Sequence, residues 1–220
     1  MQNITPRDLK KIIACLVLYV TALIASNTIG IKTMPFLFGT HLSVSVFYFP
    51  FVFLMTDVIG EVYGKKVARM FVFAGIFCVA AFLAFNVISM AMPWAKASMW
   101  AHDAYETLYG VSLRISIASL LAFAIGEYQD VLAFFFFKAK QGGKYFWLRS
   151  NLSNLWSQFF DTAIFMVIAF AGVYPTHKLI LMIIPWWLYK VAMGAAFTPL
   201  SYLGIRLLRG KHASIQETTA

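Results

Sequence analysis

Residues 69–92 read RMFVFAGIFCVAAFLAFNVISMAM, with a single charge at the first position. A helix rises about 1.5 Å per residue, so a helix of this length extends about 36 Å and can cross the roughly 30 Å hydrocarbon core of a bilayer. A backbone in lipid must satisfy its own hydrogen bonds, which favours a helix here. This stretch therefore predicts a transmembrane helix.

Five further stretches have the same character, and the composition agrees with them. The 220-residue chain is 61% hydrophobic and 12% charged, whereas soluble domains are nearer about half apolar and about a quarter charged. The predicted spans cover about 11–31, 43–63, 69–92, 111–137, 151–173 and 178–208. We therefore predict an all-α integral membrane protein with about six transmembrane helices. Residues 1–220 would form a single transmembrane domain that ends in a flexible tail at 212–220.

Basic residues are distributed unevenly between the two sides of these spans. Lys32, Lys96 and Lys178 fall on one side, and thirteen Lys and Arg fall on the other. The thirteen are Arg7, Lys10, Lys11, Lys65, Lys66, Arg69, Lys138, Lys140, Lys144, Arg149, Arg206, Arg209 and Lys211. Because Lys and Arg concentrate on the cytoplasmic side of a membrane, both termini are predicted to be cytoplasmic. The net charge of +9 thus reflects topology and does not indicate nucleic-acid binding.

Seven ionisable residues fall in or near the predicted spans. They are Asp57, Glu61, Arg114, Glu127, Asp130, Asp161 and Lys190. Each costs about 3 kcal/mol at a lipid-facing helix centre, so all seven would approach about 20 kcal/mol, which exceeds the stability of a domain. They must therefore face one another, water or a ligand. The five acids outnumber the two bases, which suits a substrate with several N–H donors or a positive charge, or proton coupling.

One predicted helix gathers its polar residues on one face. Asn151, Asn154, Gln158 and Asp161 fall within about 80° of arc, from the cytoplasmic end to the middle of the membrane. Asp161 and Lys190 both lie near the midplane, so we predict that they face each other, close to Glu127 and Asp130. Structural ion pairs and hydrogen bonds between helices are an alternative for all these residues. That alternative is strongest for Asp57 and Glu61, which lie close to the basic pair 65–66.

Several of these residues belong to segments that resemble a known family. The segments are Phe49-Pro50 with Asp57-Val-Ile-Gly-Glu61-Val-Tyr-Gly64-Lys65-Lys66, Arg114-Ile-Ser-Ile-Ala118-Ser119 with Glu127-Tyr-Gln-Asp130, Trp147-Leu-Arg149-Ser-Asn151 with Ser157-Gln158-Phe-Phe-Asp161 and Phe165, and Tyr189-Lys190 with Thr198-Pro199, together with Asn27 and Lys32. Over about 20–205 the chain resembles the YhhQ-type queuosine precursor transporters, also called the VUT family.

This resemblance implies import of 7-deazaguanine bases, 7-cyano-7-deazaguanine and 7-aminomethyl-7-deazaguanine, across the cell inner membrane to supply queuosine for tRNA modification. It also implies a fold similar to the substrate-binding subunits of energy-coupling-factor transporters, working without their ATPase module. The candidate substrate-binding residues are Asn27, Lys32, Asp57, Glu61, Arg114, Glu127, Asp130, Asn151, Asn154, Gln158, Asp161, Trp186 and Lys190. The family commonly has Gln in place of Glu127 and a small hydroxyl residue in place of Asn154, which leaves the preferred base open.

Other functions stay open on the sequence alone. A transporter of another nucleobase or vitamin-like solute, or a membrane scaffold or enzyme, are the alternatives. We find no zinc pattern, phosphate-binding loop or catalytic motif, so we expect no cofactor, no metal and no enzymatic activity. Proton-coupled and facilitated transport both suit the acids. A homo-oligomer is compatible with the small residues Gly194-Ala195-Ala196, which let helices approach closely.

Overall fold

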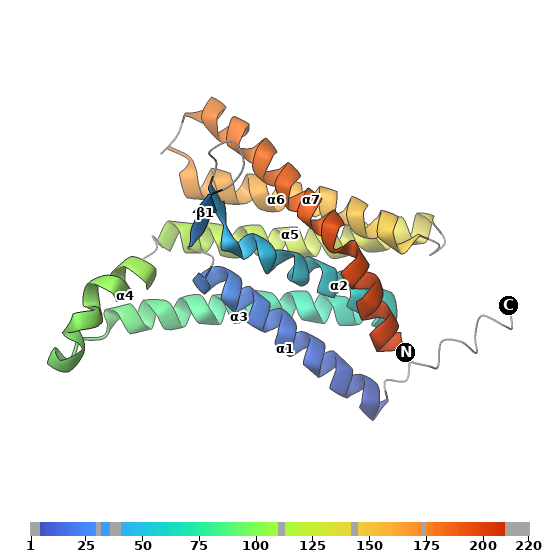
Figure 1. The fold of residues 1–220 in the computed structure, drawn as a ribbon, viewed down its shortest axis with the longest axis horizontal. Coiled ribbons are helices and arrows are strands. Elements are labelled where there is room, and N and C mark those ends of the chain that lie inside the picture. The colour runs from blue at the N-terminus through green and yellow to red at the C-terminus, as the bar shows by residue number, and fades with distance from the viewer. Residues whose placement is uncertain are drawn as a thin grey trace, which may run out of the picture.

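The computed structural model describes residues 5–29, 32–35, 41–109, 113–141, 145–172 and 175–209. These residues form seven α-helices, two 3₁₀ helices and one two-stranded hairpin (Figure 1). In chain order the elements are α1 (Pro6–Thr28), β1 (Thr33–Pro35), β2 (His41–Ser43), η3 (Val44–Phe47), α2 (Phe49–Tyr63), α3 (Lys65–Ala91), η4 (Lys96–Ala101), α4 (His102–Tyr109), α5 (Leu113–Lys140), α6 (Phe146–Phe170) and α7 (Thr176–Arg209). The predicted flexible tail at 212–220 lies outside the described residues.

The first helix begins where its sequence provides a cap. The Thr5 hydroxyl accepts a hydrogen bond from the Asp8 amide at 3.2 Å, and the Asp8 carboxylate accepts one from the Thr5 amide at 3.2 Å. This reciprocal arrangement satisfies amides that the helix itself leaves unpaired. Pro6 occupies the first turn, where a proline costs no helical hydrogen bond.

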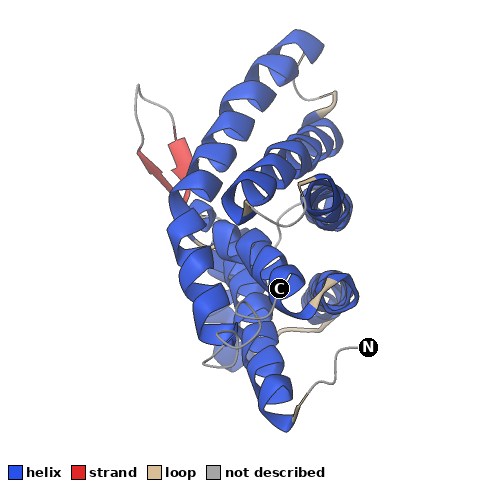
Figure 2. Cartoon of the chain, turned by 90° about the vertical axis from the view of Figure 1, so that its right-hand side faces the viewer, coloured by secondary structure: helices blue, strands red, loops and turns tan. Residues whose placement is uncertain are grey.

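The helix predicted at 43–63 is shorter than expected. Residues 41–43 form β2, which pairs antiparallel with β1, and η3 follows directly. The α-helix begins only at Phe49, with Pro50 in its first turn. The hairpin, which lies at one edge of the helices in Figure 2, is the one departure from an all-α fold among the described residues. Apolar periodicity alone did not distinguish this hairpin from a helix.

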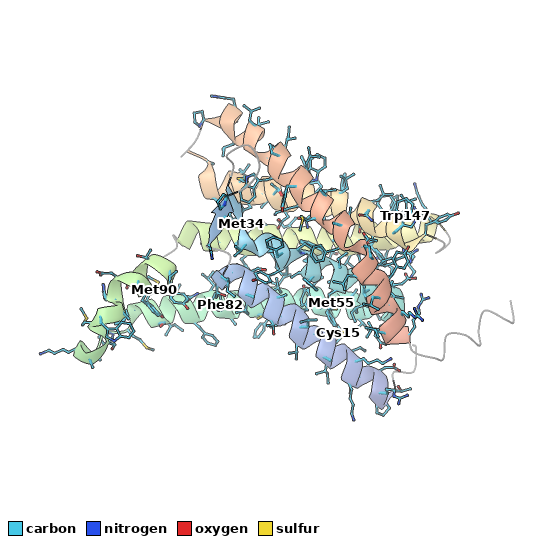
Figure 3. The ribbon with its side chains drawn as sticks, in the orientation of Figure 1. Cys15, Met34, Met55, Phe82, Met90 and Trp147 are labelled. Carbon is cyan, nitrogen blue, oxygen red and sulfur yellow. The ribbon has the colours of Figure 1, made fainter. Side chains whose placement is uncertain are left out.

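Four helices are long and apolar enough to cross a membrane by length and composition. They are Pro6–Thr28, Lys65–Ala91, Ile117–Lys140 and Leu179–Arg209. α3 exposes the rings of Phe73, Phe77 and Phe85, each at least 63% accessible, and Figure 3 shows side chains projecting outward along α1 and α3. Apolar surface of this extent fits lipid rather than water. The chain is therefore a multi-pass helical membrane protein.

α2 and α6 differ from those four helices. α2 has 15 residues and extends about 22 Å, but it packs against α1, α3, α5 and α7. Its buried residues are Pro50, Val52, Phe53, Leu54, Thr56, Asp57, Val58, Ile59 and Gly60. α6 packs along α5 and also contacts α7, and it carries the polar stripe. α2 is apolar but short, and the apolar surface of α6 is interrupted by its polar residues.

The main apolar core lies between α1, α2, α3 and α5. It consists of Tyr19, Leu23, Val52, Ile59, Phe71, Val79 and Phe123. A Cβ atom added at Gly75 would lie 2.8 Å from the Tyr19 hydroxyl oxygen, so α1 and α3 approach this closely because residue 75 has no side chain. η4 and α4 lie beyond the end of α3 (Figure 1).

Candidate substrate-binding site

A cavity of about 390 Å³ lies between the helices, within the size range of small-molecule sites. All seven helices and η3 contribute to its wall. The aromatic lining residues are Phe49, Phe53, Phe82, Tyr109, Phe165, Trp186 and Tyr189, and the polar ones include Ser26, Asn27, Thr28, Ser45, Asn86, Ser119, Asn154, Gln158, Asp161, Thr162 and Lys190. An apolar wall with a few polar groups is typical of a binding site for an organic ligand.

Asp161 on α6 and Lys190 on α7 face each other in this wall, as the sequence predicted. The Lys190 ammonium donates a hydrogen bond of 2.5 Å to the Asp161 carboxylate. The same ammonium lies 5.6 Å from the centre of the Phe49 ring, close enough for a cation–π interaction. Among the described lining residues these two carry the formal charges, so the described wall is neutral overall.

Gln158 and Thr162 present polar groups that have no hydrogen-bond partner among the described residues. Both side chains are about 2% exposed, and the unpaired atoms are Nε2 and Oε1 of Gln158 and Oγ1 of Thr162. An unpaired buried polar group costs about 1–3 kcal/mol. The two side chains together offer donors and acceptors. The wall is therefore suited to a ligand that carries complementary donors and acceptors.

Two glycines determine how closely α6 approaches its neighbours. A Cβ atom added at Gly194 on α7 would lie 1.9 Å from Asn154 Nδ2, and one added at Gly126 on α5 would lie 3.0 Å from the Asp161 Cβ atom. Both contacts require a residue without a side chain. Asn154 and Asp161 reach their positions in the cavity wall because these glycines make room for them.

Further predicted residues, Asn27 and Trp186, also line the cavity. The Ser119 hydroxyl donates to Asn27 Oδ1 at 3.3 Å, and Asn27 Nδ2 donates to the Leu23 carbonyl at 2.9 Å. Trp186 lines the cavity, whereas the Trp187 indole donates to the Leu155 carbonyl. Six predicted residues thus line one space: Asn27, Asn154, Gln158, Asp161, Trp186 and Lys190.

Three predicted residues lie elsewhere or cannot be placed. Lys32 is exposed and is not among the lining residues. Asn151 Nδ2 donates to the Trp147 carbonyl at 2.7 Å and to Thr198 Oγ1 at 3.0 Å, within a separate groove between α6 and α7. Figure 3 shows Trp147 at the end of α6 that is far from Phe82. The predicted stripe on α6 therefore divides, and Asn151 faces α7. The side chain of Arg114 lies outside the described residues.

Asp57, Glu127 and Asp130 are buried beside the cavity and are not among the residues that line it. Their exposed fractions are 3%, 0% and 0%. The Ser157 hydroxyl donates to Asp130 at 2.8 Å, and the Ser150 hydroxyl donates to Asp57. Helical spacing places Asp57 one turn beyond the cavity residue Phe53. These carboxyl groups form a separate cluster within the bundle, which we call the acid cluster.

Glu61 forms ion pairs with three cations from three different helices. Its carboxylate lies 2.7 Å from Lys138 Nζ and 3.1 Å from Arg209 Nη2, and it also pairs with Arg149. The Arg149 side chain is fully buried and lies 5.3 Å from the ring centre of Phe134. The ion-pair alternative is confirmed for Glu61, with partners on α5, α6 and α7 rather than residues 65 and 66. We call this group the inner ion-pair network.

Some lining residues were not predicted from the sequence. Thr162 lies four residues after Gln158, so it falls on the same face of α6 as the predicted polar stripe and could have been included in it. Asn86 is an amide within the apolar α3, which is itself a signal of a polar environment. Phe82 and Gly194 carry no such signal, because a Phe or Gly in a span is usually a packing residue.

The fold and the cavity define a multi-pass helical membrane protein with an internal site of small-molecule size. A family model described as "Putative vitamin uptake transporter" matches residues 43–204. The chain is 30% identical over 188 residues to a "Probable queuosine precursor transporter" of Bacillus subtilis (strain 168), which covers 85% of this chain and 81% of the relative. It is 30% identical over 147 residues to the "Queuosine precursor transporter" of Escherichia coli (strain K12), covering 67% and 63%.

No solved structure matches the chain. The family match and the relatives show that the chain belongs to the YhhQ-type queuosine precursor transporter family. This is a family of transporters, not of enzymes.

Proposed function

We propose that this protein imports queuosine precursor bases, 7-cyano-7-deazaguanine and 7-aminomethyl-7-deazaguanine, across the cell inner membrane. The observation that carries the proposal is the 390 Å³ cavity in which the polar groups of Gln158 and Thr162 have no hydrogen-bond partner in the part of the chain that the structure describes. The relatives named as queuosine precursor transporters support the choice of ligand. A flat base with several donors and acceptors matches a wall of amides, a carboxylate and aromatic rings.

The base has a polar edge that the α6 stripe can bind. A guanine-like edge offers N1–H and an exocyclic NH₂, which one carboxylate accepts as a pair. In the proposed complex Asp161 accepts both, and Gln158 bonds the carbonyl oxygen and the pyrrole N–H. Lys190 keeps Asp161 paired until the base arrives. Trp186 or Phe49 stacks on the face of the base.

The proposed topology has six spans in a single domain, formed by α1, α2, α3, α5, α6 and α7, with both termini in the cytoplasm. The inner ion-pair network supports it, because the cations that meet there, Lys138, Arg149 and Arg209, belong to the basic side of the chain. The cavity is lined by Leu108 and Tyr109 of α4, on the side with few basic residues. In the proposed arrangement the base enters from that outer side.

The cavity wall is built by helices of one chain, and in the proposed function the transporter works without an ATPase module. Similarity to energy-coupling-factor subunits and assembly into a homo-oligomer are further proposals, the latter through the small residues 194–196.

Complementation tests this function. A strain that cannot synthesise queuosine precursors, and lacks its own importer, is supplied with 7-cyano-7-deazaguanine while expressing the chain. We expect queuosine to reappear in tRNA, as measured by mass spectrometry of nucleosides. Asp161→Ala should abolish the rescue, and exposed Asp103→Ala should leave it intact. Rescue by Asp161→Ala at normal expression would remove that carboxylate from the binding site, and no rescue by the wild type would refute the proposed substrate.

A further inference from the structure

We propose that the acid cluster formed by Asp57, Glu127 and Asp130 carries a proton that moves inward together with the substrate, so that the proton gradient drives uptake. This inference rests on the proposed function for the identity of the substrate. It adds a second transported species, H⁺, and assigns it to residues that do not line the cavity.

Asp57 on α2 and Asp130 on α5 form the core of this site. Both carboxyl groups are buried, and Asp130 Oδ2 has no hydrogen-bond partner among the described residues. Two carboxyl groups can bond to each other only when one of them holds a proton, because two bare carboxylates repel. The hydroxyls of Ser150 and Ser157 donate to the remaining oxygens. The pair is thus built to hold one proton away from water.

Glu127 is an independent sign that this region binds a small cation. Its side chain is 0% exposed, and among the described residues neither carboxylate oxygen has a hydrogen-bond partner in good geometry, although the hydroxyls of Tyr19 and Thr56 lie nearby. The nearby Thr56 hydroxyl donates instead to the Phe53 carbonyl at 2.7 Å. A carboxylate with no hydrogen bond is costly inside a protein, whereas a carboxyl group that receives a proton carries no charge. A proton is therefore the ligand that this side chain lacks.

The acids form a continuous series from the cavity into the bundle. Asp161 in the cavity wall acts electrostatically on Glu127, and Gly126 brings the two helices together at that point. Glu127 and Asp130 are three residues apart on α5, so they share a face. Asp130 then meets Asp57. No other series of interacting acids connects the cavity to the interior among the described residues.

The charged and titratable groups around the series come from every helix packed against it. Tyr19 of α1 and Cys78 of α3 lie on one side. Arg149 of α6 and Lys190 of α7 lie near the two ends of the series. Arg149 forms an ion pair with Glu61, and Lys190 forms one with Asp161. Each of these two cations is thus paired with an acid at one end of the series. The acids between the two ends can therefore exchange a proton without breaking either ion pair.

The proposed cycle is balanced. A proton from the outer side joins the series when the neutral base binds and displaces Lys190 from Asp161, so the loaded protein carries one positive charge more than the empty one. Both the base and the proton leave on the cytoplasmic side, and the empty protein returns. One proton and one neutral base cross per cycle, so one positive charge moves inward. No other reactant is needed.

Purified protein in liposomes tests this inference with radiolabelled 7-cyano-7-deazaguanine, a neutral base that brings no charge of its own. With the membrane potential clamped to zero, one coupled proton predicts about tenfold more accumulation per pH unit of imposed gradient. A trapped pH dye should also report acidification of the lumen when the base is added outside. Exchange of labelled for unlabelled base with no such acidification would overturn the inference while the proposed function stands.

Two variants locate the proton. Asp130→Asn keeps an oxygen for the Ser157 hydroxyl but cannot release a proton, so we expect exchange of the base to persist while lumen acidification and gradient-driven accumulation disappear. Exposed Asp103→Asn, the matched control, should retain all three.

Three outcomes would count against the inference. If Asp130→Asn acidifies the lumen as much as the wild type does, the assignment of the proton to the acid cluster is overturned. If that variant does not fold, the wild-type dye measurement still decides whether a proton moves. A wild type that exchanges no base overturns the proposed function and this inference with it.

Discussion

The cavity and the inner ion-pair network both contain buried polar side chains, but those side chains are in opposite states. In the cavity, the amide group of Gln158 and the hydroxyl group of Thr162 have no hydrogen-bond partner within the described segments. In the network, Glu61 has three cationic partners from three helices. A saturated group holds helices together, whereas an unpaired buried group costs free energy until something binds it. Whether buried polar groups have partners therefore distinguishes a binding site from a structural cluster better than the presence of charged residues does.

Glu61→Ala should have the largest effect, and on stability. It would leave the fully buried Arg149 without its carboxylate, which costs about 3–5 kcal/mol for a buried ion pair. Arg209 is 44% exposed, so solvent screens its share of the loss. Unfolding in detergent, followed by fluorescence, measures the change against Asp103→Ala. Equal stability of the two variants would contradict a structural role for the network.

Gly194→Ala should impair the site through its neighbour. The new Cβ atom would lie 1.9 Å from Asn154 Nδ2, and overpacking of this kind costs about 1–3 kcal/mol. We expect uptake to fall at unchanged membrane expression. Combining the change with Asn154→Ser makes room and should restore most of the uptake. A double variant as impaired as the single one would show that the contact with Asn154 is not the cause.

Gln158→Leu should separate stability from uptake. It removes two unpaired polar atoms from a buried position, so the protein should be as stable as the wild type or more stable. Losing a hydrogen bond to the substrate of about 1.4 kcal/mol raises the KM for uptake about tenfold. Uptake kinetics and detergent unfolding measure the two effects. Lower stability with normal uptake would place Gln158 with the structural residues.

Thr162→Val should have the smallest effect. The side chain keeps its shape and loses only the unpaired hydroxyl, so we expect about threefold weaker uptake, for a bond of about 0.7 kcal/mol, and no loss of stability. The same two measurements apply. An unchanged KM would mean that this hydroxyl does not contact the base.

The sequence predicted the membrane class, most of the helix bounds and the Asp161–Lys190 pair, because apolar length and helical spacing are local properties. It did not separate Glu61 and Asn151 from the cavity residues. Their partners, Arg209 and Thr198 among them, are distant in sequence and are brought close only by packing of α2 and α6 against α7. It also missed Gly194, since a close approach between helices cannot be read from one helix alone.

The most direct test of this account is equilibrium binding of radiolabelled 7-cyano-7-deazaguanine to purified protein, because it bypasses transport. Wild type and Asn151→Ala, whose side chain lies outside the cavity, should bind with the same affinity. Gln158→Leu, altered on the same helix but inside the cavity, should bind about tenfold more weakly, a loss of about 1.4 kcal/mol. Unchanged binding by Gln158→Leu, or loss of binding by Asn151→Ala alone, would contradict the assignment of the cavity as the substrate site.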